Sequence, residues 1–240
     1  WQLPERVGAV GLTTNPDVCV IALESGFALF NLTNERLTRL NLPESLGPDL
    51  RFNDGKCDPF GGFIAGTMSE TLPRRDEAAL YRLAPDLSVS TLKTGIRVSN
   101  GLAFTTDGKA VFADSPDRTI WSYDFDATGF SNEQVFVGPE AMIGVPDGAE
   151  TDLNGNLWAA EWDGSRIGVY PFSGRTPTYI PLPVMRPTSC CFGGPEFSTL
   201  FITSALAPDE PHALDGHVLA IPNAGKGPAA NRFQLRTSAA

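Results

Sequence analysis

Cysteine is scarce in this sequence, and its spacing excludes several kinds of site. The four cysteines, at positions 19, 57, 190 and 191, form neither a C-x-x-C pair nor, with the two histidines, a set with zinc-ligand spacing. Cys190 and Cys191 are adjacent in an apolar stretch, where neighbouring side chains of a strand point to opposite faces. We therefore predict reduced, mostly buried cysteines and a cytoplasmic protein.

Histidine and serine-nucleophile motifs are equally sparse. His212 follows a proline in a late loop, His217 stands at the start of the last expected strand, and no G-x-S-x-G motif is present. A serine hydrolase of the usual kind needs both a nucleophile turn and a histidine base. We therefore expect no serine nucleophile and no catalytic histidine.

Basic stripes and long apolar runs are also missing. The net charge is −10, the isoelectric point is near 4.6, and the 18 Lys and Arg residues are scattered. Such a charge pattern lacks the phosphate-neutralising surface of a nucleic-acid binder. The longest apolar run, Val18 to Leu23, is far shorter than the roughly 18 residues that a membrane span needs. We therefore predict neither a nucleic-acid partner nor a membrane partner.

Glycine and proline, by contrast, are plentiful and evenly spread. The chain has 240 residues with 24 Gly and 20 Pro, a composition that suits many short strands joined by tight turns and leaves little room for long helices. Repetitive all-β chains of this length commonly form one domain. We predict a single all-β domain over residues 1–240.

A repeat runs along the chain. Three segments pass from a polar turn through an apolar stretch and a second turn into a β-rich strand; they span 53–66, 100–113 and 147–160. The second turns carry Gly61, Gly108 and Gly155, and their steps are equal, since 108 − 61 = 47 and 155 − 108 = 47. A fourth copy spans 188–203 and a degenerate earlier one 7–21. Equal periods of this size are typical of propeller and solenoid folds.

Each copy also supplies further strands. Third strands are expected at 79–83, 119–123 and 166–170, each followed by a more polar outer strand. Four strands in about 45 residues make a propeller blade. The repeat therefore predicts a β-propeller built of four-stranded antiparallel blades.

Three polar residues stand at the start of the innermost strand in successive copies. They are Asn53, Asn100 and Asp147, and their spacings are again equal, since 100 − 53 = 47 and 147 − 100 = 47. Equivalent positions in a propeller lie at one radius and one height, so these side chains are expected to converge on the central channel. Converging oxygen groups suit a hard cation. Residues of these types also cap turns, and the spacing alone leaves both interpretations open.

The sequence around these positions resembles the SMP-30/gluconolactonase/LRE family. The matching motifs are RFNDGK at 51–56, AGTM at 65–68, SNGLA at 99–103, ADS at 113–115, PDG at 146–148, GNLW at 155–158 and RPTSCCFGG at 186–194. They follow the family's order and approximate spacing, and the resemblance covers roughly residues 5 to 235.

The resemblance implies a fold and a metal site. It implies a six-bladed propeller with one axial divalent cation, Ca²⁺, Mg²⁺, Mn²⁺ or Zn²⁺ depending on the member, bound by a Glu near the N-terminus, an Asn and an Asp. Asn100 and Asp147 match the last two, and Asp147 matches the usual general base. All-oxygen ligation favours Ca²⁺, Mg²⁺ or Mn²⁺.

The resemblance also implies substrate contacts. Residues matching Arg51 and Asn53 contact sugar oxygens in the family. Glu70 and Glu161 are weaker candidates for the rim of the pocket, and of these two Glu70 is predicted to bind substrate. Two further acidic residues, Asp54 and Asp114, either belong to the site or brace neighbouring turns.

The predicted function is metal-dependent hydrolysis of a small sugar lactone, as in a gluconolactonase. The cation would polarise the lactone carbonyl, and a carboxylate would take the proton of the attacking water. A non-catalytic propeller that keeps the metal as a structural element and binds a sugar acid or a protein partner is the main alternative. Hydrolysis of another ester by the same metal is a second alternative.

The resemblance also raises an expectation about the start of the chain. Five copies are visible where the family has six, and the family's Gly-Glu-Gly-Pro stretch with its metal-binding Glu is absent. We expect most of the N-terminal blade to be lacking, with a remnant sixth blade, a gap in the ring and weaker metal binding. An open strand edge favours association, so we expect a monomer or a weak homo-oligomer.

Overall fold

The fold is all-β. The computed structural model describes residues 1–40, 42, 46–207, 209 and 211–235. In these ranges every regular element is a strand, apart from two 3₁₀-helices of three residues each, η1 (Ser115–Asp117) and η2 (Pro139–Ala141). The prediction of hardly any helix is therefore confirmed. Within the described ranges, no helix is long and apolar enough to cross a membrane.

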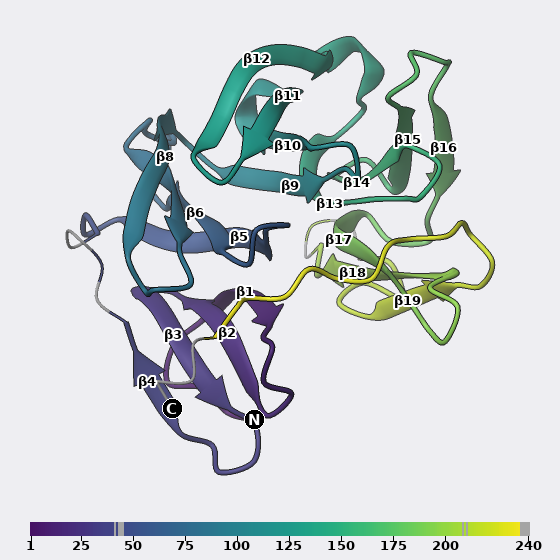
Figure 1. The fold of residues 1–240 in the computed structure, drawn as a ribbon. Helices are drawn as coiled ribbons and strands as arrows, with labels where there is room; N and C mark the ends of the chain where they lie inside the picture. The colour runs from purple at the N-terminus through teal and green to yellow at the C-terminus, as the bar shows by residue number, and fades with distance from the viewer. Residues whose placement is uncertain (41, 43–45, 208, 210, 236–240) are drawn as a thin grey trace. The chain divides into compact units, whose positions relative to one another are not determined.

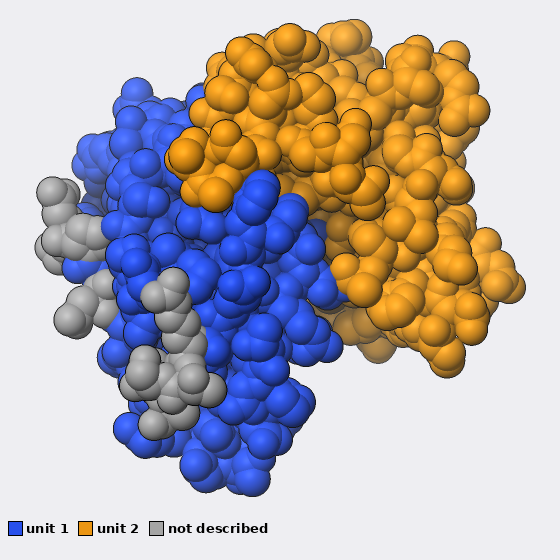
Figure 2. Space-filling view, viewed as in Figure 1, with its two compact units in different colours: residues 1–99, 230–240 blue, residues 100–229 orange. Residues whose placement is uncertain are grey.

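The chain divides into two compact units (Figure 2), each described here by itself. Unit 1 holds residues 1–99 and 230–240, and unit 2 holds residues 100–229. The expectation of a single domain stays a prediction.

Unit 1 contains two four-stranded antiparallel sheets, which we call blades 1 and 2 (Figure 1). In both, the strands follow one another in chain order. Blade 1 is β1 (Val7–Leu12), β2 (Val18–Leu23), β3 (Gly26–Asn31) and β4 (Leu37–Arg39). Blade 2 is β5 (Leu50–Cys57), β6 (Phe63–Ser69), β7 (Ala78–Leu83) and β8 (Val89–Ile96).

Unit 2 contains three antiparallel sheets, blades 3 to 5. Blade 3 is β9 (Ser99–Phe104), β10 (Lys109–Asp114), β11 (Thr119–Asp126) and β12 (Gly129–Val137). The first residue of β9, Ser99, is assigned to unit 1 and the rest of the blade to unit 2. Blade 4 is β13 (Val145–Thr151), β14 (Asn156–Trp162), β15 (Arg166–Pro171) and β16 (Thr178–Pro181). Blade 5 has three strands, β17 (Arg186–Gly193), β18 (Thr199–Ala205) and β19 (Val218–Ile221). The strands predicted from the repeat are all present.

The prediction of a six-bladed propeller is wrong, because the described residues form five blades. The last expected strand, which begins after His217, is β19 (Val218–Ile221), the third strand of blade 5, paired with β18. The segment after it is rich in glycine and proline, and Lys226 and Gly227 bond to the loop residues Leu153 and Phe197 rather than to a strand ladder. Within the described residues there is thus no remnant of a sixth blade.

The cores lie between blades of the same unit. The middle strand β2 is apolar throughout and all six of its residues are buried, as expected where a sheet is covered on both faces. Between blades 1 and 2, Phe27 packs against Phe52 and Phe63, with ring centroids 4.8 and 5.9 Å apart. The fully buried Phe233 joins this core, and its backbone pairs with Thr13 in a parallel bridge.

Blades 4 and 5 share a second core. It includes Trp158, Ile167, Val184, Cys190 and Leu200. All four cysteines are free, and three of them are buried while Cys191 is exposed. These thiols behave as the small buried hydrophobes that the sequence predicts.

Candidate functional site

Two innermost strands carry β-bulges at positions that the sequence singles out. The pairing of β5 with β6 shifts register between Phe52 and Gly55, which places Asn53 in the bulge. The pairing of β13 with β14 shifts between Pro146 and Ala149, which places Asp147 in a second bulge. A bulge re-aims its side chains and is common beside active sites. At Asn53 and Asp147 the repeat therefore marks a local distortion as well as a repeated strand.

Close packing accompanies the bulge in unit 2. A Cβ added at Gly148 would lie 2.3 Å from the Ser189 Oγ, so this position tolerates no side chain without movement of β17. Gly101, directly after Asn100, has φ +66, and a Cβ there would lie 3.4 Å from the backbone oxygen of Asp147. The backbones that carry Asn100 and Asp147 thus approach each other within unit 2.

A buried hydrogen-bond chain connects these two segments. Asn100 Nδ2 donates to Ser115 Oγ over 2.8 Å, and Ser115 Oγ donates to the backbone oxygen of Pro146 over 2.7 Å. Asn100 and Ser115 are 6% and 5% exposed. Because the amide nitrogen of Asn100 is directed at Ser115, its carbonyl oxygen lies on the opposite side of the side chain. This order of donors fixes the orientation of Asn100 relative to the residue that precedes Asp147.

The donor set of unit 2 suits a hard cation. An amide oxygen of Asn100 and a carboxylate of the half-buried Asp147 are oxygen ligands of the kind that Ca²⁺ and Mg²⁺ prefer. In the described part of the chain, no group of three or more His, Cys, Asp or Glu side chains is placed to hold a metal. The fit therefore rests on the side-chain oxygens of these two residues.

Arg51 and Asn53 interact directly in unit 1. Arg51 Nη1 donates to the Asn53 Oδ1 over 3.0 Å and to the Phe52 backbone oxygen over 2.9 Å. Asn53 Nδ2 in turn donates to the backbone oxygen of Ser99 over 3.0 Å. Among the described residues, none accepts a hydrogen bond from Nη2 of Arg51, whose side chain is 21% exposed. This end of the guanidinium therefore remains able to donate to a ligand.

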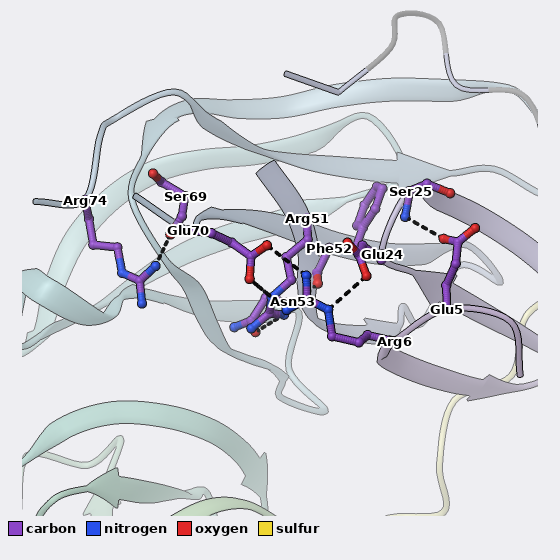
Figure 3. A network of polar contacts seen from close by, with 10 residues as sticks. All are labelled: Glu5, Arg6, Glu24, Ser25, Arg51, Phe52, Asn53, Ser69, Glu70 and Arg74. Atoms are coloured by element: carbon purple, nitrogen blue, oxygen red, sulfur yellow. Dashed lines mark hydrogen bonds and ion pairs between the residues drawn. The ribbon is translucent and has the colours of Figure 1, made fainter. Parts of the chain in front are cut away.

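Glu70 lies beside Arg51 and is also bound by a second arginine (Figure 3), while its contact with a substrate stays a prediction. Arg51 Nε donates to Glu70 Oε1 over 3.2 Å. Arg6 grips the same carboxylate with two parallel bonds of 2.8 Å, from Nη1 to Oε1 and from Nη2 to Oε2. Arg6 Nε also donates to Glu24 Oε2 over 2.8 Å. The result is a network of two arginines and two glutamates, which we call the Arg6 network.

The pKa values of Glu70, Glu24 and Arg51 are all lowered, for two different reasons. The hydrogen bonds from Arg6 are the main reason that the pKa values of Glu70 and Glu24 lie below their usual range. Burial lowers the pKa of the Arg51 guanidinium, and Glu70 opposes that effect. Arg51 nevertheless keeps its charge at neutral pH, as arginine side chains in proteins do.

Three other acidic residues highlighted by the sequence, Glu161, Asp54 and Asp114, lie in local structural surroundings. Glu161 is fully buried and binds Arg166 and Tyr170 over 2.9 and 2.8 Å, so the expectation that it lines a pocket rim is not supported by its burial. Asp54 Oδ1 accepts from the backbone nitrogen of Gly55 over 2.9 Å, which is the bracing role. Asp114 is buried at the start of η1 and makes no side-chain cap.

Three residues of these networks were not anticipated from the sequence. Arg6 and Glu24 come from the loops flanking β1 and β2, and Ser115 comes from η1. Ser115 belongs to the ADS motif beside Asp114, and that motif is the one signal that points to it. Arg6 and Glu24 have no counterparts at the repeat spacing, so the repeat carries no signal for them.

Comparison with known proteins gives two similar relatives. The chain is 36% identical to a regucalcin of Xenopus laevis over 207 residues, which is 83% of this chain and 69% of the relative. It is 33% identical to an L-arabinolactonase of Azospirillum brasilense over 244 aligned positions, 97% of this chain and 80% of the relative. The chain thus spans between two thirds and four fifths of these relatives' lengths.

A solved structure and a family model agree with these relatives. A calcium-binding regucalcin of Agrobacterium tumefaciens str. C58 superposes with a TM-score of 0.88 at 24% identity, covering 98% of this chain and 82% of that one, which shows a shared fold. The model of the SMP-30/gluconolactonase/LRE-like region matches residues 1–206. The chain therefore belongs to the SMP-30/gluconolactonase/LRE-like family, as its motifs predict.

Proposed function

We propose that this protein is a metal-dependent carboxylic-ester hydrolase that opens the lactone ring of a small sugar lactone. The observation that carries the proposal is the buried hydrogen-bond chain from Asn100 through Ser115 to the backbone oxygen of Pro146, the residue before Asp147, which lies in the bulge of β13. Membership of a family whose relatives include a named L-arabinolactonase supports the reaction class. The particular sugar is not readable from these residues.

Asn100 and Asp147 would hold the cation, with Ca²⁺, Mg²⁺ or Mn²⁺ favoured over Zn²⁺ by the all-oxygen donor set. A bound divalent ion supplies Lewis acidity toward the lactone carbonyl and toward a water molecule. Asn100 contributes a neutral oxygen whose direction is set by Ser115, and Asp147 contributes charge.

Asp147 would also move the proton. Its carboxylate accepts the proton of the attacking water as the new carbon–oxygen bond forms. When the ring carbon–oxygen bond breaks, the same proton passes to the departing ring oxygen, which becomes the hydroxyl of the product acid. One water is consumed and no other co-reactant is needed.

Arg51 and Asn53 would bind substrate oxygens. The Nη2 protons of Arg51 are donors in fixed directions that suit hydroxyl or carbonyl oxygens, and Glu70 occupies the neighbouring Nε proton. Asn53 holds Arg51 from the other end through Oδ1. This assignment predicts that Arg51→Ala raises KM far more than it lowers kcat.

One panel assay tests the proposal. The protein is stripped with a chelator, reloaded with Ca²⁺, Mg²⁺, Mn²⁺ or Zn²⁺ singly, and assayed by acid release against glucono-, galactono-, xylono- and arabinono-lactones. Hydrolysis that disappears on chelation and returns with one metal supports the proposal. Metal binding without hydrolysis of any lactone or aryl ester would favour the non-catalytic propeller instead.

Two further expectations remain predictions. The free state of all four cysteines is consistent with a reducing compartment such as the cytoplasm. A monomer or weak homo-oligomer is still expected, and sedimentation of the purified protein tests it.

A further inference from the structure

Arg6 belongs to the same hydrogen-bonded network as Arg51, although it lies far away in the sequence and outside every repeat motif. Glu70 is the link, because its Oε1 accepts from both Arg6 Nη1 at 2.8 Å and Arg51 Nε at 3.2 Å (Figure 3). Of the hydrogen bonds that Glu70 receives on its side chain, two come from Arg6 and the longest comes from Arg51. The position of this carboxylate is thus determined mainly by Arg6.

The backbone around Arg6 makes it a fixed anchor. The Glu24 nitrogen donates to the Arg6 carbonyl over 2.8 Å, while Arg6 Nε returns a bond to the Glu24 side chain. The Glu24 carbonyl then accepts from the nitrogen of Phe52, the residue next to Arg51, over 3.1 Å. Arg6 is therefore tied to β5 by two routes, one through the Glu70 side chain and one through the Glu24 backbone.

Exposure makes this anchoring necessary. The side chains of Arg6, Glu24 and Glu70 are 54%, 39% and 37% exposed, so water competes for each of their bonds. A single exposed ion pair holds its side chains loosely, whereas a bidentate arginine–carboxylate pair within a network adds geometric restraint. Without Arg6, the Glu70 carboxylate would keep one side-chain hydrogen bond, the one from Arg51 Nε. It would then move with Arg51 instead of holding Arg51 in place.

We propose that Arg6 is a positioning residue for substrate binding, which acts by holding Glu70 so that Glu70 directs the Nη2 end of Arg51 toward the substrate. This inference rests on the proposed function of Arg51. Arg6 itself contacts Glu24 and Glu70 and needs no contact with the substrate. Replacement of Arg6 is therefore expected to raise KM and to leave kcat nearly unchanged.

The kinetic test compares Arg6→Gln, Arg6→Lys, Glu70→Gln and the Arg6→Gln/Glu70→Gln double variant. Arg6→Gln should raise KM about tenfold with kcat changed by less than about twofold. Arg6→Lys should rescue part of the loss, since lysine restores the charge without the two parallel bonds. In the Glu70→Gln background, Arg6→Gln should add little, because the link to Arg51 is already weakened.

The matched control is Arg39→Gln. Arg39 is an equally exposed arginine of the same unit, paired with Glu5 and Ser25 and without contact to Glu70 or Arg51. It should leave KM unchanged. The inference is overturned if Arg6→Gln keeps the wild-type KM, or if its effect equals that of Arg39→Gln or adds fully to that of Glu70→Gln.

A second measurement does not depend on catalysis. The Nε proton signal of Arg51, assigned by its loss in Arg51→Lys, should exchange faster with water in Arg6→Gln and be unchanged in Arg39→Gln. If the wild type hydrolyses no lactone but the Arg51 Nε proton exchanges faster in Arg6→Gln, the proposed function fails while the positioning of Arg51 by Arg6 stands. Unchanged exchange in Arg6→Gln overturns the positioning role whatever the activity.

Discussion

Ser115 limits which residue can stand at position 100. Its hydroxyl has one proton, which goes to the Pro146 carbonyl, so Ser115 can only accept from residue 100. An asparagine satisfies this requirement with its amide nitrogen, whereas an aspartate would present two acceptors to the same oxygen. The chain of donors therefore favours a neutral ligand at position 100 and leaves the negative charge to Asp147.

Replacing Ser115 tests whether Ser115 orients Asn100, and the quantity measured is the affinity for a divalent metal. Ser115→Ala should weaken divalent-metal binding roughly 10- to 100-fold, the usual range for a residue that orients a ligand. Calorimetric titration of the stripped protein measures it, with Ser122→Ala on the third strand of the same blade as the control. An unchanged affinity would show that Asn100 needs no such orientation.

In the proposed mechanism, Asp147 is the residue on which the chemistry depends most. Asp147→Asn keeps an oxygen ligand but removes the base, so kcat should fall by roughly 10²- to 10⁴-fold while the protein stays folded. Steady-state assays under saturating metal separate this loss from weakened binding. Wild-type kcat in the metal-loaded variant would rule out Asp147 as the base.

The cysteines allow a test of the structure by reactivity. Burial raises the pKa of the Cys57 thiol to about 12, and burial likewise raises that of Cys19, while Cys191 is exposed. At pH 8 a thiol reagent should modify Cys191 rapidly and the other three only after unfolding. Peptide mapping of the labelled protein identifies the site, and fast modification of Cys57 in the folded protein would contradict its burial.

The same shift has a consequence for stability. The folded-state pKa of Cys57, about 12, lies above the ordinary pKa of a cysteine thiol, which is about 9. Its contribution to stability is therefore complete below pH 9 and is lost as the pH rises toward 12, where the unfolded chain releases a proton that the folded chain retains.

At the scale of the strand, the bulge in β13 depends on Gly148. Gly148→Ala brings a methyl group within 2.3 Å of Ser189 Oγ and 3.0 Å of its Cα, so β17 must shift. We expect a loss of about 1–3 kcal/mol in the free energy of unfolding, as for overpacked sites. Denaturant titration measures it.

Gly194→Ala in the turn after β17 serves as the control for Gly148→Ala. An added Cβ there would find its nearest neighbour at 3.6 Å, so the cost reflects its positive φ of 83° rather than a clash. It should cost about 1 kcal/mol and leave metal affinity intact, whereas Gly148→Ala should lower that affinity by moving Asp147. If Gly148→Ala and Gly194→Ala had equal effects on metal affinity, the bulge in β13 would not be needed for metal binding.

The elements show what the sequence could and could not predict. The strands of the repeat were predictable because apolar runs such as Val18–Leu23 must be buried on both faces, and turn glycines such as Gly108 mark their ends. The equal spacing of Asn53, Asn100 and Asp147 found positions that the structure places at bulges or beside a positive-φ glycine. A bulge itself has no sequence code at this level, so it was not predicted.

Residues outside the repeat escaped prediction for a physical reason. Arg6 and Glu24 are brought to Glu70 by the pairing of β1 with β2 and the contact of β1 with β5, which are long-range events without local periodicity. The number of blades was wrong because it came from the family resemblance rather than from the five copies counted in the chain. The copies themselves match the five sheets.

At the scale of the whole molecule, metal binding should appear as stability. A cation that binds only the folded state at 100 times its Kd adds about 2.7 kcal/mol, which for a chain of this size raises Tm by roughly 5–10 °C. Thermal unfolding with and without chelator measures the shift, and Asn100→Ala should show little of it. An equal shift in Asn100→Ala would place the cation elsewhere.

The burial of Phe233 in the core of unit 1 has a consequence for synthesis on the ribosome. That core brings together Val20, Phe52 and Phe233, so its first and last members are separated by all of unit 2 along the chain. Blades 1 and 2 emerge from the ribosome early, yet their shared core stays open until residues 230–235 have been translated. The later blades can form their own contacts during this interval, and completion of the first unit is the last step of folding rather than the first.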